Sequence, residues 1–150
     1  MSSDPHEDSD PALTLLRDAL ARQDGEDLAR ALLLATLPPV PSGDRAPVLA
    51  LALEASWHTL HEDIARALQV HRDPRTVPAL ARAARTKHAY LAYDDSHAFA
   101  RKCIWAMADV GTTEAHAHLQ ELAQEADPEI AGYARRRLAR WDEERGRKGA

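Results

Sequence analysis

Short apolar segments with helical spacing follow one another along this chain, and strong helix-starting or helix-breaking signals separate them. Leu60, Ile64 and Leu68, for example, recur at an interval that places them on one face of an α-helix. β-branched residues are few, and no segment alternates between apolar and polar residues as a half-buried strand does. The pattern predicts an all-α fold in which short helices bury their apolar faces against one another.

Aspartate-proline pairs mark several of the predicted helix starts. Asp10-Pro11, Asp73-Pro74 and Asp127-Pro128 each combine a good N-cap with a residue suited to the first turn. Gly111 ends one helix, and the proline-rich run 38–43 is the clearest break in the chain. We predict about eight helices: from 11, over 26–37, over 46–56, from about 57–59 to 70, over 74–85, from 95 or 96 to 110, from 113, and over 128–142.

Composition is consistent with one domain over residues 9–142, between a disordered tail at 1–8 and a charged tail at 143–150. The chain has 150 residues, of which 45% are hydrophobic and 29% charged, so it can bury a core. Its net charge of −5 disfavours nucleic acid as a partner, because phosphate contacts need a basic surface. The same charge favours a basic protein partner.

The sequence also predicts a cytoplasmic protein. Cys103 is the single cysteine, so no disulfide forms within the chain. The acidic N-terminus lacks the features of a signal peptide, and no apolar stretch is long enough to cross a bilayer, so no membrane contact is expected.

The run from Arg101 to Ala115 resembles the second helix and the turn of bacterial HEAT-like repeats (PBS-lyase HEAT-type), in which an alanine-rich helix precedes an Asp-x-Gly turn. Asp109-Val110-Gly111 matches that turn, and a weak self-similarity between 64–70 and 103–109 has an offset of roughly 39 residues, close to the HEAT period. The resemblance covers 58–140, whereas 1–56 match only in helix pattern. It implies a curved α-solenoid of antiparallel helices with a concave face.

The same resemblance implies a scaffold for protein contacts, because HEAT-like domains are similar in that role. Some small bacterial members are immunity proteins, which block a toxin, and others are adaptors. DNA glycosylases, bilin lyases and one iron hydroxylase that binds metal through repeated His-Glu pairs also have HEAT-like folds. The resemblance therefore predicts the fold and leaves several functions open.

One polar cluster, His58, His61 and Glu62, could belong to a metal-dependent enzyme or a metal-binding module. On a helix these side chains would share one face, and imidazole and carboxylate are metal ligands. However, the order of residues differs from the zincin motif, and one His-Glu pair falls short of the hydroxylase pattern. A polar helix edge is the favoured interpretation, so neither a metal nor another cofactor is predicted.

A second cluster lies in the long connection before the helix that ends at Val110. It contains tyrosines and acids that could dock a basic partner, because tyrosine supplies contact area and a hydrogen bond at small entropic cost. Alternatively Tyr90, Leu91 and Tyr93 fix the connection to the core while Asp94 or Asp95 caps the helix; both interpretations stay open. The predicted partner-binding surface comprises Glu62, Asp63, Tyr90, Tyr93, Asp94 and Asp95.

Further features complete the prediction of a non-catalytic protein-binding scaffold, immunity-like or an adaptor. Lys102 could pair with an acid such as Asp94 or Asp95 or line a groove, although extension to solvent is favoured. Cys103 is expected to be an inert buried thiol. Arg135, Arg136 and Arg137 could contact nucleic acid, although a solvated terminal helix is favoured. Phosphate-binding loops, dinucleotide fingerprints and nucleophile elbows are absent from the sequence.

Overall fold

The computed structural model describes residues 10–36, 44–93 and 97–144, and these residues are all-α, as predicted. They contain no strand. The predictions for 1–8 and for the break at 38–43 lie outside the described residues, as does most of the predicted tail at 143–150. Residues 143 and 144 are described and belong to a helical turn, so the predicted start of that tail is wrong. The helices are α2 (Pro11–Arg22), α3 (Gly25–Ala35), α4 (Arg45–Leu53), α5 (His61–His71), α6 (Val77–Arg85), α7 (Ala98–Val110), α8 (Thr113–Leu122) and α9 (Pro128–Ala139), with 3₁₀ turns at η1 (Pro74–Thr76) and η2 (Ala89–Leu91).

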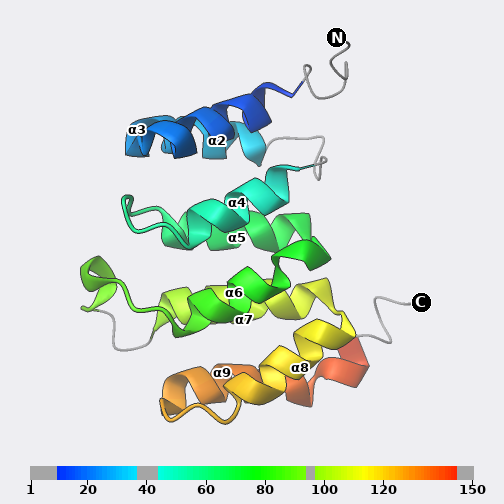
Figure 1. Ribbon diagram of the computed structural model, residues 1–150. Coiled ribbons are helices and arrows are strands. Elements are labelled where there is room, and N and C mark those ends of the chain that lie inside the picture. Colours follow the sequence, from blue (N-terminus) through cyan, green and yellow to red (C-terminus); the bar gives the residue numbers. More distant parts are fainter. Residues whose placement is uncertain (1–9, 37–43, 94–96, 145–150) are drawn as a thin grey trace.

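The helices pack in consecutive pairs, and the pairs follow one another from the N-terminal to the C-terminal end (Figure 1). Within the pairs, α2 packs on α3, α4 on α5, α6 on α7 and α8 on α9. Between pairs, α5 packs on α7, α7 on α9, and α3 touches α5, so these second helices are neighbours. No helix in the described part of the chain is both long and apolar enough to cross a membrane.

Side-chain caps start four of the α-helices, α2, α3, α8 and α9. The Asp10 and Asp127 carboxylates accept from backbone N–H groups at the starts of α2 and α9, as their Asp-Pro pairs predict. Gly111 ends α7 in the left-handed region at φ 76°, where a residue without Cβ is unstrained. α2 ends at Gln23, whose backbone is also left-handed (φ 53°), and α3 begins at Gly25.

Three helices begin later than predicted. The helix predicted from 74 is α6, which begins at Val77 because its first turn is the 3₁₀ turn η1. α5 begins at His61 instead of at 57–59, because the His58 ring bonds to nearby backbone: Nδ1 accepts from the Leu60 N–H (3.0 Å) and Nε2 lies 2.6 Å from the Ala52 carbonyl oxygen. Such side-chain bonds to backbone compete with helix formation. α7 begins at Ala98 after His97, whose left-handed backbone (φ 53°) is incompatible with a helix continuing from 95 or 96.

The core is centred on α7, as its apolar character on all sides predicts. This helix packs against α5, α6, α8 and α9, and Cys103, Ile104 and Met107 are completely buried. Alanines among them let the neighbouring helices approach closely. Burial raises the pKa of the Cys103 thiol far above its ordinary value, in agreement with an unreactive side chain.

A buried ion pair joins the first two helix pairs. Arg45, the first residue of α4, donates from Nη2 to Asp10 at 2.9 Å and from Nε to both Asp10 oxygens. The same carboxylate caps α2 through the Leu13 N–H. One aspartate therefore starts a helix and fixes its position against the next pair.

Candidate functional site

Three imidazoles stack at the N-terminal end of α5, and we call His58, His61 and His88 the histidine cluster. The ring centroids are 4.1 Å apart for His58 and His61 and 3.7 Å apart for His61 and His88. His61 is completely buried; its Nε2 lies 2.6 Å from the Ala55 carbonyl oxygen and its Nδ1 lies 2.7 Å from the Tyr90 hydroxyl. The rings thus join α5 to the connection that precedes α7.

The hydrogen bonds of His58 and His61 fit the neutral form of both rings. A carbonyl oxygen only accepts, so Nε2 of His58 and Nε2 of His61 carry the proton and donate it. The other nitrogen of each ring accepts, from the Leu60 N–H and from the Tyr90 hydroxyl respectively. Burial, and to a smaller extent the neighbouring imidazoles, lower the pKa of His61 to about 4 against the opposing effect of the Ala55 bond.

This geometry corrects the interpretation of His58, His61 and Glu62 as one helical face with free ligand atoms. His58 precedes α5, so it is not one helical turn from Glu62. Both nitrogens of His58 and of His61 are engaged, and Glu62 forms an ion pair with Lys102. Among the described residues, no group of three or more histidine, cysteine, aspartate or glutamate side chains is placed to hold a metal ion.

The predicted acidic and aromatic surface is charge-balanced in its described part. Lys102 does not extend freely to solvent, because its ammonium pairs with Glu62. Asp63 lies 3.8 Å from the Arg66 guanidinium. Asp94 and Asp95 lie outside the described residues, so their predicted contribution to this surface stays a prediction.

The two tyrosines of that surface differ in their surroundings. Tyr90 bonds to His61 and fixes the connection, together with Leu91, which packs against the core. Burial raises the pKa of Tyr90, and the charges of Glu62 and Asp63 raise it further, so these groups lie within electrostatic reach of one another. Tyr93, by contrast, is 80% exposed.

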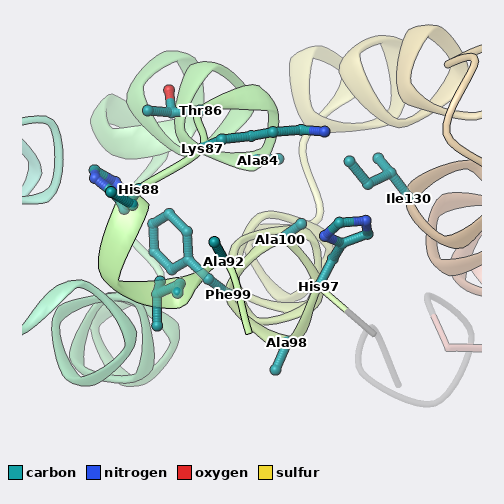
Figure 2. A pocket seen from close by; sticks show the side chains of 12 residues that line it. Ala84, Thr86, Lys87, His88, Ala92, His97, Ala98, Phe99, Ala100 and Ile130 are labelled. Carbon is teal, nitrogen blue, oxygen red and sulfur yellow. The ribbon is translucent and has the colours of Figure 1, made fainter. Parts of the chain in front are cut away.

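A cavity of about 520 Å³ lies between the connection after α6 and the start of α7 (Figure 2). Its walls are mainly apolar, including Phe99, Ala100 and Ile130. His97 lines it as well, and Nε2 of this ring lies 2.7 Å from the Asp127 carboxylate that caps α9. Figure 2 shows Lys87 extending toward the side where His97 and Ile130 lie. The sequence did not predict this cavity.

An apolar groove of about 480 Å³ runs between α3 and α5. Leu33 and Val70 line it and are 71% and 55% exposed, so two large aliphatic side chains are open to solvent within one hollow. Asp63 and Arg66 stand at its polar side. The full lining of the apolar groove comprises Ala29, Leu32, Leu33, Thr36, Leu60, Asp63, Arg66, Ala67 and Val70.

Next to it, a basic groove of about 430 Å³ is bounded by α5, α7 and α9. Four cations and two aromatic rings contribute to its walls. Arg66 lines both grooves, so the two hollows are contiguous along α5. The residues of the basic groove are Arg66, Gln69, Arg101, Lys102, Trp105, Tyr133 and Arg136.

Beneath the basic groove, Arg137 forms buried ion pairs with Asp109 and Glu144. Arg137 is 7% exposed, and its Nη2 lies 2.7 Å from Asp109 and 2.9 Å from Glu144. Gln69 donates to the other oxygen of Asp109 at 2.8 Å. The guanidinium lies over the Trp105 ring, 5.2 Å from its centroid. The expectation that the C-terminal arginines form a solvated run is therefore wrong for Arg137, and Glu144 belongs to a helical turn at 141–144.

Sequence reasoning missed the basic groove because its residues come from three helices. Within each helix a spacing signal exists: Arg101 and Trp105 are four residues apart, and Tyr133 and Arg136 are three apart, so each pair shares a face. The sequence does not reveal that these faces meet. That information comes only from the packing of α7 on α5 and α9.

No protein-family model, curated protein or solved structure matches this chain. The resemblance to HEAT-like repeats therefore stays a prediction, and the function is argued from the geometry of the grooves.

Proposed function

We propose that this protein works by binding a partner protein, and that the partner docks on the face where α3, α5, α7 and α9 are neighbours. One observation carries the proposal: the apolar groove and the basic groove are contiguous on this face, and the apolar groove exposes Leu33 and Val70. Large exposed aliphatic side chains with polar neighbours are typical of protein interaction sites.

The arrangement of helix pairs supports this proposal. In a HEAT-like solenoid, which we propose as the finer description of the fold, the second helices of successive pairs form one continuous binding face. Here α3, α5, α7 and α9 are those second helices, and both grooves lie between them. An immunity-like or adaptor role, without catalysis, is the form of this function that the resemblance suggests.

Capture with matched variants tests the docking face. The tagged wild-type chain, the double variant Leu33→Glu/Val70→Glu and the control Leu51→Glu are each used to retain proteins from a lysate of the native host, followed by mass spectrometry. Leu51 is a suitable control because it is 64% exposed on α4 and lines neither groove. All three substitutions replace exposed side chains, so helix content by circular dichroism should be unchanged.

We expect the wild type and the Leu51→Glu variant to retain one protein in stoichiometric amount. The Leu33→Glu/Val70→Glu variant should not retain it. Equal retention by all three chains would place the partner elsewhere and overturn this docking face. If the wild type retains no protein at all, the protein-binding function itself is wrong.

Tyr93 offers a second candidate surface, because an 80% exposed tyrosine beside Tyr90 provides contact area for a partner. The adjacent Asp94 and Asp95 would make that partner basic, as the sequence predicts. Replacing Tyr93 and Asp94 together by alanine should then weaken retention of a basic protein and leave the helix content intact. Unchanged retention would remove this surface.

A further inference from the structure

The basic groove carries positive charge that the described residues do not neutralise, on a chain whose net charge is −5. Lys102 pairs with Glu62, and Arg66 lies 3.8 Å from Asp63. Arg101 and Arg136 are exposed, and neither forms an ion pair with a described residue. Both guanidinium groups therefore remain available to an anionic ligand.

The two aromatic rings of the basic groove are largely covered by neighbouring side chains, so little of their faces is exposed. Tyr133 is only 5% exposed and meets Trp105 edge to face, at a centroid distance of 5.8 Å. Arg137 covers one face of Trp105, and Arg136 lies 5.6 Å from the Tyr133 centroid. Single-stranded nucleic acid is normally held by bases stacked on exposed rings. The basic groove offers guanidinium donors instead, which suit carboxylates.

The apolar groove and the basic groove share a wall residue on α5. Arg66 lines the basic groove on one side and the apolar groove on the other, and both open along α5. A ligand that occupies both hollows must therefore carry apolar groups for Leu33 and Val70 and anionic groups for Arg101 and Arg136. A peptide segment that combines leucine-like and carboxylate side chains meets both requirements.

We infer that the docking segment of the partner is acidic as well as apolar, with carboxylates paired to Arg101 and Arg136 and aliphatic side chains in the apolar groove. This inference rests on the proposed function and specifies its partner. The planar guanidinium fork matches a carboxylate in bidentate geometry, so each arginine fixes orientation in addition to supplying charge. The basic surface would also speed the encounter with an acidic segment.

The inference is tested by titrating the full chain with a short synthetic peptide of glutamate and leucine. A peptide with glutamine in place of every glutamate controls for apolar binding, and an oligothymidylate of similar length reports nucleic acid. Binding is followed by amide chemical shifts in ¹H–¹⁵N NMR spectra, at low and at moderate salt. The variants are Arg101→Glu/Arg136→Glu and, as a control with the same change in net charge, Arg72→Glu/Lys87→Glu, whose residues line neither groove.

We expect the glutamate peptide to shift amides of α5, α7 and α9. Its affinity should fall about tenfold or more in the Arg101/Arg136 variant and change little in the Arg72/Lys87 variant. Salt should weaken this binding, and the glutamine peptide should bind less tightly.

The inference of an acidic docking segment would be wrong if the glutamate and glutamine peptides bound with equal affinity. It would also be wrong if both charge variants bound the glutamate peptide equally tightly. The proposed function would still stand if Leu33→Glu/Val70→Glu abolished binding of the partner found by capture. Tighter binding of the oligothymidylate than of the peptide would assign the groove to nucleic acid, and binding of neither would also overturn the inference.

Discussion

The histidine cluster and the basic groove both concentrate polar side chains along α5, yet they differ in how far the protein satisfies those groups. In the histidine cluster, carbonyl groups, a backbone N–H and a tyrosine hydroxyl take up all four nitrogens of His58 and His61. In the basic groove, Arg101 and Arg136 project without an ion pair to a described residue. The cluster therefore stabilises the fold, whereas the groove leaves binding capacity for another molecule.

This difference shows that residue type alone does not identify a site. Histidines beside a glutamate suggest metal chemistry, but their nitrogens become unavailable once the backbone uses them. Arginines in a terminal helix suggest a solvated surface, but a neighbouring helix can turn them into one wall of a groove. Variants in the cluster and in the groove should therefore affect stability and binding separately.

The largest effect on stability is expected at the ion pair below the basic groove. Replacing Arg137 by alanine leaves the half-buried Asp109 carboxylate without its main counter-charge, which should lower the free energy of unfolding by about 3 kcal/mol. Urea denaturation followed by circular dichroism measures this change. Arg136→Ala is the matched control on the same helix, and a similar loss in both variants would contradict the division between support and binding residues.

A somewhat smaller loss is expected within the histidine cluster. His61→Ala removes a completely buried ring together with its hydrogen bonds to the Ala55 carbonyl and the Tyr90 hydroxyl, and should cost about 2 to 3 kcal/mol. His88→Ala removes a half-buried ring with no hydrogen-bond partner at Nε2, and about 1 kcal/mol is expected. If the two variants had equal stability, the hydrogen bonds of His61 would contribute nothing.

The sequence predicted the elements better than their assembly. The cap residues Asp10, Thr112 and Asp127 and the terminator Gly111 act locally, so these helix ends follow from adjacent residues. The start of α5 was misplaced because the bond from His58 to the Ala52 carbonyl spans a turn that periodicity does not register.

The candidate site was harder to predict, because its residues are distant in sequence. Arg66, Trp105 and Arg136 meet only after α5, α7 and α9 pack together. Likewise Lys102 pairs with Glu62, forty positions earlier in the chain, whereas the sequence suggested only nearby acids such as Asp94 or Asp95. Of the predicted partner-binding residues, Asp63 lines the apolar groove and Glu62 pairs with a wall residue of the basic groove.

The pH dependence of stability should also separate the two regions. The lowered pKa of His61, about 4 against an ordinary value of 6.5, means that the unfolded chain takes up this proton first as the pH falls. Stability should therefore be fully present above pH 6.5 and be lost progressively down to about pH 4, by about 2 kcal/mol from this group. His58 and His88, whose pKa values are also lowered by burial, add to the loss in the same direction.

Denaturant midpoints between pH 7 and pH 5 measure this effect above the range where carboxylates titrate. The variant His61→Phe keeps a ring in the stack and has no proton to gain, so its midpoint should be lower at pH 7 but fall less steeply toward pH 5. An unchanged slope in this variant would mean that His61 does not stay neutral in the folded protein.

The smallest effect on stability is expected at Arg101 and Arg136, where the effect on binding should be greatest. Replacing Arg101 and Arg136 by glutamine removes two exposed charges near Arg66 and Lys102 without removing an ion pair to a described residue. Because like charges repel, the free energy of unfolding should stay within about 0.5 kcal/mol of the wild type or rise slightly at low salt. Urea denaturation at low and high salt measures this change, and the small gain should vanish at high salt.

A loss above about 1 kcal/mol would show that these arginines serve the fold, as the histidine cluster does. Binding groups commonly persist at some cost to stability, so a variant that is equally stable but no longer binds the acidic peptide would confirm that the basic groove exists for a ligand.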